Sequence, residues 1–244
     1  MRAGALLALV VVLGCGGDKT RPPPPVVPSD APPPPDAPPP PEAVPEHVQL
    51  PRSPAGPLHK TTAALDAKEL ARLAAIPHRD FERDVRATSS QTAEFRHTTT
   101  TRPKLGVTVA IQPCGKRARR PCSAMELAQW LPRTDELKRS INPELAGRPD
   151  TKFELGSRDV AGSPAIYTYQ LGYFSGTDKH GQPTTTYSDA YTLYYNDGFN
   201  QIRVNAAYVD DLLGSAEQLT AVAPKEDLEK LAVAFLSFYA HEWK

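Results

Sequence analysis

Apolar residues occupy every second position in the stretch "KLGVTVAIQ" near the middle of the chain. Successive side chains of a β-strand point to opposite faces, so this alternation predicts a strand with one buried face. Further runs rich in β-branched and aromatic residues predict three more strands, and the turn sequence "NDG" predicts a hairpin from the last of these into a fifth. The predicted strands lie at residues 104–112, 152–155, 165–174, 187–195 and 199–208.

Two other segments show the spacing of a helix instead. After Pro224, apolar residues recur at intervals of three and four, which predicts a C-terminal amphipathic helix with one buried stripe. The stripe comprises Leu228, Leu231, Ala232, Phe235 and Phe238. A helix is also predicted at residues 63–75, where Asp66 and Glu69 have the spacing of a capping box and Pro77 ends the pattern.

Two short helices are predicted between the first and second strands, at residues 123–132 and 135–141, whereas residues 79–101 are polar and ambiguous. Together these elements predict an α+β fold, with a mostly antiparallel sheet of about five strands flanked by helices as an α/β/α sandwich. The elements are expected to form a single domain over residues 58–244, in which residues 58–100 are a candidate helical appendage.

The N-terminal end has the three parts of a secretory signal peptide. Arg2 supplies a positive charge, residues 5–13 are apolar and Gly14 is a small residue at the end. The apolar run is too short to span a membrane as a helix, which takes about 20 residues. Residues 1–14 are therefore predicted to be a signal peptide.

The last part of this segment, Val12 to Cys15, resembles the lipobox of bacterial lipoproteins. The resemblance implies that the chain is cut before Cys15, and that Cys15 carries lipid on its sulfur and on its new amino terminus. Acyl chains of this kind would hold the protein on a membrane. An ordinary signal peptide with an incidental cysteine is the alternative. The resemblance also implies a bacterial cell envelope facing the periplasm, and Gly16 in place of an aspartate favours the outer membrane.

Proline dominates the next part of the chain. Residues 22–57 hold 17 of the 27 prolines and almost no large apolar side chain. Such a segment buries too little surface to offset its ordering entropy, and it favours extended polyproline II. Residues 15–57 are therefore predicted to be the lipidated N-terminus and a disordered tether that holds the domain off the membrane. Recognition of PxxP motifs by an SH3-like partner is the alternative.

Besides Cys15, the chain has two cysteines, Cys114 and Cys122. Disulfides persist in an oxidising compartment, so this pair is predicted to form one, with two buried thiols as the alternative. The ring would contain four cations: Lys116, Arg117, Arg119 and Arg120. A constrained basic loop suits phosphate or carboxylate groups, whereas a charge run can also be a plain solvated loop.

All nine tyrosines follow residue 166, and most lie on the third and fourth predicted strands. Tyrosine suits both the half-buried face of a sheet and a binding surface, because its ring is apolar and its hydroxyl is polar. Ordinary packing and an aromatic binding face are therefore both open. The binding face would consist of Tyr167, Tyr169, Tyr173, Tyr191 and Tyr195.

The terminal helix "LEKLAVAFLSFYAHEW", set against a tyrosine-rich meander, is similar to the Mog1/PsbP-like α/β/α sandwich over residues 100–244. The likeness includes the Ser237-Phe238 ending of the helix, and small envelope lipoproteins are known in that family. It implies the sandwich but no particular activity, since one fold carries unrelated functions. A cystatin-like or NTF2-like helix on a curved sheet fits the element order as well.

Linear signatures of catalysis are absent: the chain has no GxSxG elbow, no HExxH motif and no glycine-rich phosphate loop. The balance of 28 Lys and Arg against 28 Asp and Glu gives no case for nucleic acid. We therefore expect a protein that is not an enzyme, needs no cofactor or metal, and binds another envelope protein or a cell-wall component. The oligomeric state stays open.

Residues 175–186 are predicted to be a long polar loop, and they offer a competing hypothesis of a small-ligand-binding or hydrolytic domain. Asp178 and His180 are candidate metal ligands there, with Asp189 or the Asp210-Asp211 pair as partners. No third ligand has a recognisable spacing, so a metal site is not expected. A purely structural spacer is the third hypothesis, and it predicts neither an exposed patch nor a pocket.

Overall fold

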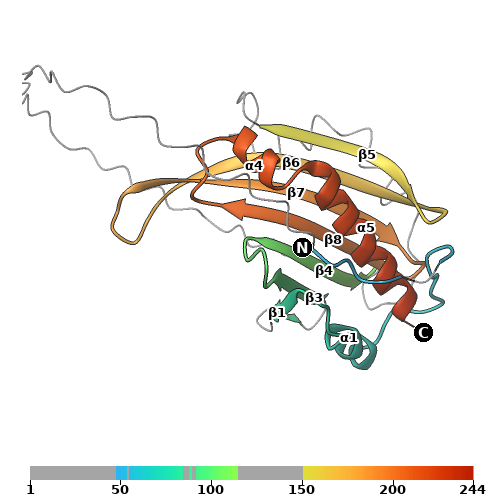
Figure 1. Ribbon diagram of the computed structural model, residues 1–244. Helices are drawn as coiled ribbons and strands as arrows, with labels where there is room; N and C mark the ends of the chain where they lie inside the picture. Colours follow the sequence, from blue (N-terminus) through green and yellow to red (C-terminus); the bar gives the residue numbers. More distant parts are fainter. Residues whose placement is uncertain (1–47, 54, 85–87, 90–91, 115–150, 244) are drawn as a thin grey trace, which may run out of the picture. The chain divides into compact units, whose positions relative to one another are not determined.

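The computed structural model describes residues 48–243 except residues 54, 85–87, 90–91 and 115–150 (Figure 1). The chain divides into two units, Met1–Glu42 and Ala43–Lys244, and every described residue belongs to the second. The signal peptide, Cys15, most of the tether and the basic loop therefore lie outside the described residues. So do the two helices predicted at residues 123–132 and 135–141.

Eight strands in the described part of the chain form one antiparallel sheet. They are β1 (Phe81–Asp84), β2 (Thr88–Ser89), β3 (Thr92–Thr99), β4 (Leu105–Pro113), β5 (Lys152–Val160), β6 (Ser163–Thr177), β7 (Pro183–Asn196) and β8 (Asn200–Asp210). Their order across the sheet is β1-β3-β4-β8-β7-β6-β5, and β2 pairs with β3. The α+β class and the antiparallel sheet are thus confirmed, whereas the expectation of about five strands was too low.

Three helices accompany the sheet: α1 (Ala67–Ala74), α4 (Ala216–Val222) and α5 (Lys225–Glu242). α5 lies across β4, β7 and β8 on one face, as Figure 1 shows. Four of the five predicted stripe residues of α5 are fully buried, and Phe238 packs against the core as a partly buried side chain. The predicted cap of α1 is also confirmed, because the Asp66 carboxylate accepts the backbone N–H of Glu69 at 2.8 Å. The sequence pattern missed α4.

The register of the sheet decides which side chains face α5. Tyr169 pairs with Tyr191, Tyr191 with Ala206, and Ala206 with Val107, so these four residues form one row across β6, β7, β8 and β4. All four are buried. Residues two positions away along each strand share their face. We call this the inner face of the sheet.

Residues 79–101, whose sequence is polar and ambiguous, supply three of the strands. β3 alternates buried Ala93, Phe95, His97 and Thr99 with more exposed neighbours. Two of these four buried residues, His97 and Thr99, are polar, so the sequence does not show the alternation of apolar residues that marks a strand. The candidate helical appendage at residues 58–100 is therefore wrong, because that segment contributes one helix and three strands of the same sheet.

The chain enters the domain beside α5. Residues 48–65, which we call the N-terminal strap, are fastened by backbone hydrogen bonds from His59 N–H to the Ala240 carbonyl (3.2 Å) and from Thr61 N–H to the Asp197 carbonyl (2.7 Å). Leu58 is buried in the core. The folded domain thus begins before the first predicted element. No helix within the described ranges is long and apolar enough to span a membrane.

Candidate functional site

β6 and β7 run past the rest of the sheet as a two-stranded arm, residues 174–186 (Figure 1). β8 ends at Asp210, opposite Tyr187, and β5 begins at Lys152, opposite Leu171. Beyond these points the register pairs β6 and β7 only with each other among the described residues. The loop expected at residues 175–186 is therefore mostly a hairpin, with a short turn at residues 178–182.

The turn at the tip of the arm is built around Asp178. Its Oδ1 accepts the backbone N–H groups of His180 and Gln182, each at 2.8 Å, and Gly181 supplies a positive φ of 78°. This is the local capping for which an aspartate suits a turn. The described residues contain no group of three or more His, Cys, Asp or Glu side chains that could hold a metal ion. The carboxylate that was a candidate metal ligand thus shapes the hairpin.

The arm is exposed along its length. Phe174 is 50% exposed, and residues 175–183 and 185 are exposed as well. A two-stranded ribbon is marginally stable by itself, so its order depends on its base. There the rings of Tyr173 and Tyr187 lie 5.7 Å apart, and the Tyr187 hydroxyl donates to the Gly214 carbonyl at 3.2 Å.

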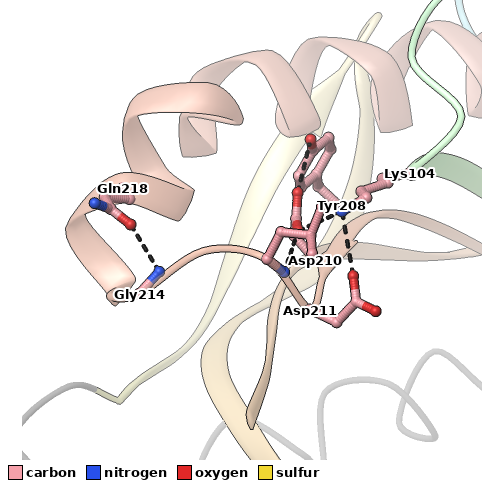
Figure 2. A network of polar contacts seen from close by, with 7 residues as sticks. Lys104, Tyr208, Asp210, Asp211, Gly214 and Gln218 are labelled. Carbon is pink, nitrogen blue, oxygen red and sulfur yellow. Dashed lines mark hydrogen bonds and ion pairs between the residues drawn. The ribbon is translucent and has the colours of Figure 1, made fainter. Parts of the chain in front are cut away.

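A polar network braces the end of β8 beside the arm (Figure 2). Lys104 forms ion pairs with Asp210 and, at 3.3 Å, with Asp211. Asp210 also accepts the Tyr208 hydroxyl at 3.3 Å and the Leu212 backbone N–H at 2.8 Å. Burial by itself would raise the pKa of Asp210, but the hydrogen bond from Lys104 and its other donors bring that pKa below its ordinary value. Asp210 is therefore a charged, fully partnered carboxylate.

Within the same network, the Gly214 backbone N–H donates to Oε1 of Gln218 at 2.7 Å (Figure 2). Ser215 caps α4 by accepting the N–H of Gln218. The connection from β8 to α4 is thus fixed on both sides of Gly214, the residue that receives the Tyr187 hydroxyl. The base of the arm therefore rests on an ordered segment.

A second carboxyl lies on the inner face one strand away. Asp189 on β7 pairs with Tyr208 and is fully buried. Its Oδ2 accepts the Tyr169 hydroxyl at 3.3 Å, whereas its Oδ1 has no hydrogen-bond partner in the described part of the chain. Burial raises the pKa of Asp189 to about 7. Asp189 and Asp210 thus have opposite pKa shifts, because in the described part of the chain Asp210 forms an ion pair with a lysine and Asp189 does not.

Charged side chains of β5 and α5 meet above the neighbouring tyrosines. Arg158 pairs with Glu229 and lies 3.4 Å from the Tyr191 hydroxyl, while its buried Nε has no partner among the residues described. Lys225 pairs with Glu154, and its Nζ lies 5.1 Å from the centre of the Tyr169 ring. These groups line the start of α5.

The five candidate tyrosines do share the inner face, as their spacing predicted. Tyr169, Tyr191 and Tyr195 are at most 3% exposed, so these three do not form an accessible aromatic surface. Tyr167 is partly buried and stacks on Tyr191 with ring centres 5.3 Å apart. Their positions match the packing alternative. Tyr173 differs, because it stands at the base of the arm.

The basic loop leaves the sheet at the other end. Pro113 pairs with Asn200, and the Cys114 backbone N–H donates to the Phe199 carbonyl at 2.9 Å, beside the β7–β8 turn. Cys122 lies outside the described residues, as do the four cations Lys116, Arg117, Arg119 and Arg120. The Cys114–Cys122 disulfide and the basic ring therefore stay predictions.

An open pocket of about 660 Å³ lies between the N-terminal strap and α1, lined by residues 59–66, 68, 69 and 72. Several of its charged groups already have partners: Asp66 caps α1, Arg72 pairs with Glu69, and Lys60 donates to the Asn196 carbonyl at 2.9 Å. The pocket adjoins the β7–β8 turn through Thr61, so it belongs to the end of the sheet remote from the arm.

Sequence reasoning missed the arm and the buried state of Asp189. The three consecutive threonines Thr184, Thr185 and Thr186 were a usable signal for the arm, because β-branched residues favour strands. No linear signal marks Asp189, since its burial depends on α4 and α5 covering the sheet.

No protein-family model and no curated protein matches this chain. Among solved structures, it is similar to the human StarD13 (DLC2) lipid transfer and protein localization domain, at 10% sequence identity and a TM-score of 0.24. That likeness covers 73% of this chain and 98% of the StarD13 chain. A TM-score this low does not establish a shared fold.

Proposed function

We propose that this protein is a lipid-anchored component of a bacterial cell envelope that acts by non-catalytic binding of another protein. The anchor is Cys15, supported by the resemblance of Val12 to Cys15 to a lipobox and by the apolar run before it. Residues 15–47 of the Pro-rich tether would hold the domain off the membrane, in the periplasm and facing away from the outer membrane. The contact is made by the arm, residues 174–186.

The protrusion of the arm is the observation that carries this proposal. An exposed pair of strands presents backbone N–H and C=O groups to other chains, which makes it a hazard for a protein that does not use it. Binding modules use such edges to pair with an extended segment of a partner, because main-chain hydrogen bonds supply affinity. Phe174, half exposed at the base of the arm, adds an apolar anchor.

A finer fold assignment belongs to the same proposal. We infer an α/β/α sandwich of the Mog1/PsbP-like kind. Ala110, Ile166 and Thr192 support it, because they lie on the face opposite to α5 and are nevertheless at most 7% exposed. A sheet face that is open to water would leave such residues accessible. Cover on both faces is what the sandwich requires.

Small-ligand binding is the second candidate function, favoured by two buried atoms. Asp189 Oδ1 and Arg158 Nε have no hydrogen-bond partner among the described residues, although a buried polar atom normally has one. A polar ligand that donates to Asp189 Oδ1 would satisfy that atom, and a ligand that accepts from Arg158 Nε would satisfy the other. Thermal shift of the purified chain against small hydroxylated acids would detect it.

Cross-linking in cells, followed by mass spectrometry, tests the main proposal. Three variants accompany the native chain: Cys15→Ala, a form without residues 22–47, and a form in which Asn-Gly replaces residues 175–185. Asn-Gly closes a two-residue hairpin and keeps the register of Phe174 with Thr186. We expect a protein partner that the native chain captures and the arm-shortened form loses.

Three results would contradict the proposal. Capture that is unchanged without the arm removes the arm from binding. Recovery of cell-wall fragments in place of a protein identifies another class of partner. An unlipidated N-terminal peptide in the mass spectrum of the native chain refutes the anchor at Cys15.

A further inference from the structure

A buried histidine of β3 and a partly buried histidine before β1 share one tyrosine hydroxyl of α5. His78 Nε2 and His97 Nε2 each lie 3.1 Å from the Tyr239 hydroxyl oxygen. The two imidazole rings meet edge to face, with centres 4.8 Å apart. Phe235 lies within 5.4 Å of both rings, and Phe238 lies 4.8 Å from His78. We call His78, His97 and Tyr239 the histidine clamp.

The hydrogen-bond donors and acceptors of the clamp limit how many added protons it can hold. A tyrosine hydroxyl donates one hydrogen bond and accepts others, and a neutral imidazole offers one N–H and one lone pair. With both histidines neutral, Tyr239 donates to one Nε2 and accepts N–H from the other. One added proton keeps this pattern, because the protonated ring donates and the neutral ring accepts. A second added proton leaves the Tyr239 hydrogen without an acceptor and places two cations side by side.

Among the described residues, no carboxylate forms an ion pair with either histidine, and Asp80, two residues after His78, instead accepts the Gln49 backbone N–H at 2.9 Å. Burial lowers the pKa of His78 to about 4, and burial, His78 and Arg83 lower the pKa of His97 to about 4. On β1, Arg83 is the strand neighbour of His97, so both side chains are on the inner face. Glu82 and Asp84 are on the opposite face. From β3, Glu94 and Arg96 alternate away as well, and Asp84 pairs with Arg96. Glu242 of α5 forms an ion pair with Arg72 of α1.

The clamp joins two parts of the domain that are far apart in the sequence. His78 follows α1 and bridges to Phe81 at the start of β1, while Tyr239 lies in the last turns of α5. The other contacts between these parts are apolar packing and one surface link: the Phe81 ring lies 5.1 Å from the Phe235 ring, Leu73 is buried in the shared core, and Arg72 reaches Glu242. β1 also pairs along its four residues with β3. The clamp is thus the polar fastening inside this contact between α5 and the segment of α1 and β1.

We propose that the histidine clamp is an acid-operated release: protonation of both His78 and His97 frees residues 67–84 from α5 while β4 to β8 stay folded. The clamp responds to pH because its closed form cannot accommodate a second added proton. The release does not depend on the lipid anchor or on the arm. Because the N-terminal strap leads directly into α1, the release would also change how the strap contacts the rest of the domain.

Hydrogen exchange of the full chain in detergent, followed peptide by peptide from about pH 6.5 to 3.5, tests the release. We expect peptides covering residues 67–84 to lose protection by about tenfold or more as the pH falls, while peptides from β7 and β8 keep theirs. The imidazole resonances of His78 and His97 should titrate in two coupled steps.

Substitutions separate release from general acid unfolding. Glutamine at position 97 cannot take a proton, so in His97→Gln residues 67–84 should keep their protection at about pH 3.5. The same result is expected for His78→Gln, which removes the more accessible ring. His180→Gln at the tip of the arm is the matched control and should behave as the native chain does. His78→Gln serves if His97→Gln does not fold. The proposal is overturned if protection falls equally with and without His97, if β7 and β8 lose protection together with α1, or if both imidazoles titrate near 6.5, their ordinary value.

Discussion

The Tyr169 hydroxyl lies 3.3 Å from Asp189 Oδ2 on the neighbouring strand, and neither side chain is more than 3% exposed. Asp210, the other carboxyl at this end of the inner face, is paired with Lys104, whereas the hydrogen bond that Asp189 makes comes from a neutral phenol. A buried carboxyl without a cation keeps its proton to higher pH. Stability should therefore depend on pH through Asp189 in the direction opposite to most carboxylates.

Asp189→Asn should stabilise the domain at high pH. Burial raises the pKa of Asp189 from 3.8 to about 7, so its favourable contribution is full below about pH 4 and is lost as the pH rises through 7. Asparagine resembles the protonated acid in shape and carries no charge. We expect a gain of about 1–3 kcal/mol in unfolding free energy at pH 8 and little change near pH 4. Urea unfolding at both pH values measures it, and an equal effect at the two values would count against the buried proton.

His97 acts in the opposite sense. Its pKa falls from 6.5 to about 4 on folding, so its contribution is present above pH 6.5 and is lost as the pH falls toward 4. His78, whose pKa also falls to about 4, adds to the trend of His97, so Asp189 offsets only part of the histidine trend between pH 4 and 7. The fall in unfolding free energy from pH 6.5 to 4 should therefore be steeper in Asp189→Asn than in the native chain, by on the order of 3 kcal/mol. A flat profile in that variant would contradict the role of His97.

Gly198→Ala should destabilise the domain more than Gly162→Ala. Both glycines have positive φ, +119° and +78°, but a Cβ at Gly198 would stand 2.7 Å from the Thr61 carbonyl oxygen, whereas one at Gly162 meets nothing within 4 Å. We expect a cost of about 1 kcal/mol at Gly162 and about 2–4 kcal/mol at Gly198. Midpoints of denaturant unfolding measure both. Equal costs would mean that the strap does not press on the β7–β8 turn in solution.

Lys104→Met should cost about 1–3 kcal/mol, because it leaves the nearly buried Asp210 without its cation. Lys230→Met is the matched control, since its partner Asp227 is an exposed neighbour three residues away on α5. Such surface pairs contribute about 0–1 kcal/mol. Thermal unfolding of both variants, at low and high salt, provides the comparison. Comparable losses in the two would indicate that Asp210 is well solvated.

Replacing residues 175–185 with Asn-Gly should leave the melting temperature within about 3 °C of the native value, because exposed residues bury little apolar area. Tyr187→Ala at the base should lower it further, since it removes the contact with Tyr173 and the hydrogen bond to Gly214. Differential scanning calorimetry measures both. A large loss on shortening would show that the arm supports the fold, which would weaken its assignment as a contact.

The sequence pattern was sufficient to predict a helix or strand wherever that element has one uniformly apolar face. The alternation of Leu105, Val107, Val109 and Ile111 predicted β4, and the apolar stripe after Pro224 predicted α5, because each has a single apolar face. The same logic failed for β3. Its inner face carries His97 beside Phe95, and that histidine is buried only because Tyr239 comes to meet it from α5.

Sequence alone determined the antiparallel α+β class, the cap of α1 and the shared face of the tyrosines, since spacing along a strand or helix fixes direction. Tertiary structure decided what those directions meet. It buried Tyr169 and Tyr191 under α5 and left Asp189 without an ion pair among the described residues. It also ended β5 and β8 before the tips of β6 and β7, so that residues 174–186 stand free. Burial, charge partners and strand ends are properties of pairs of segments, and no single segment contains them.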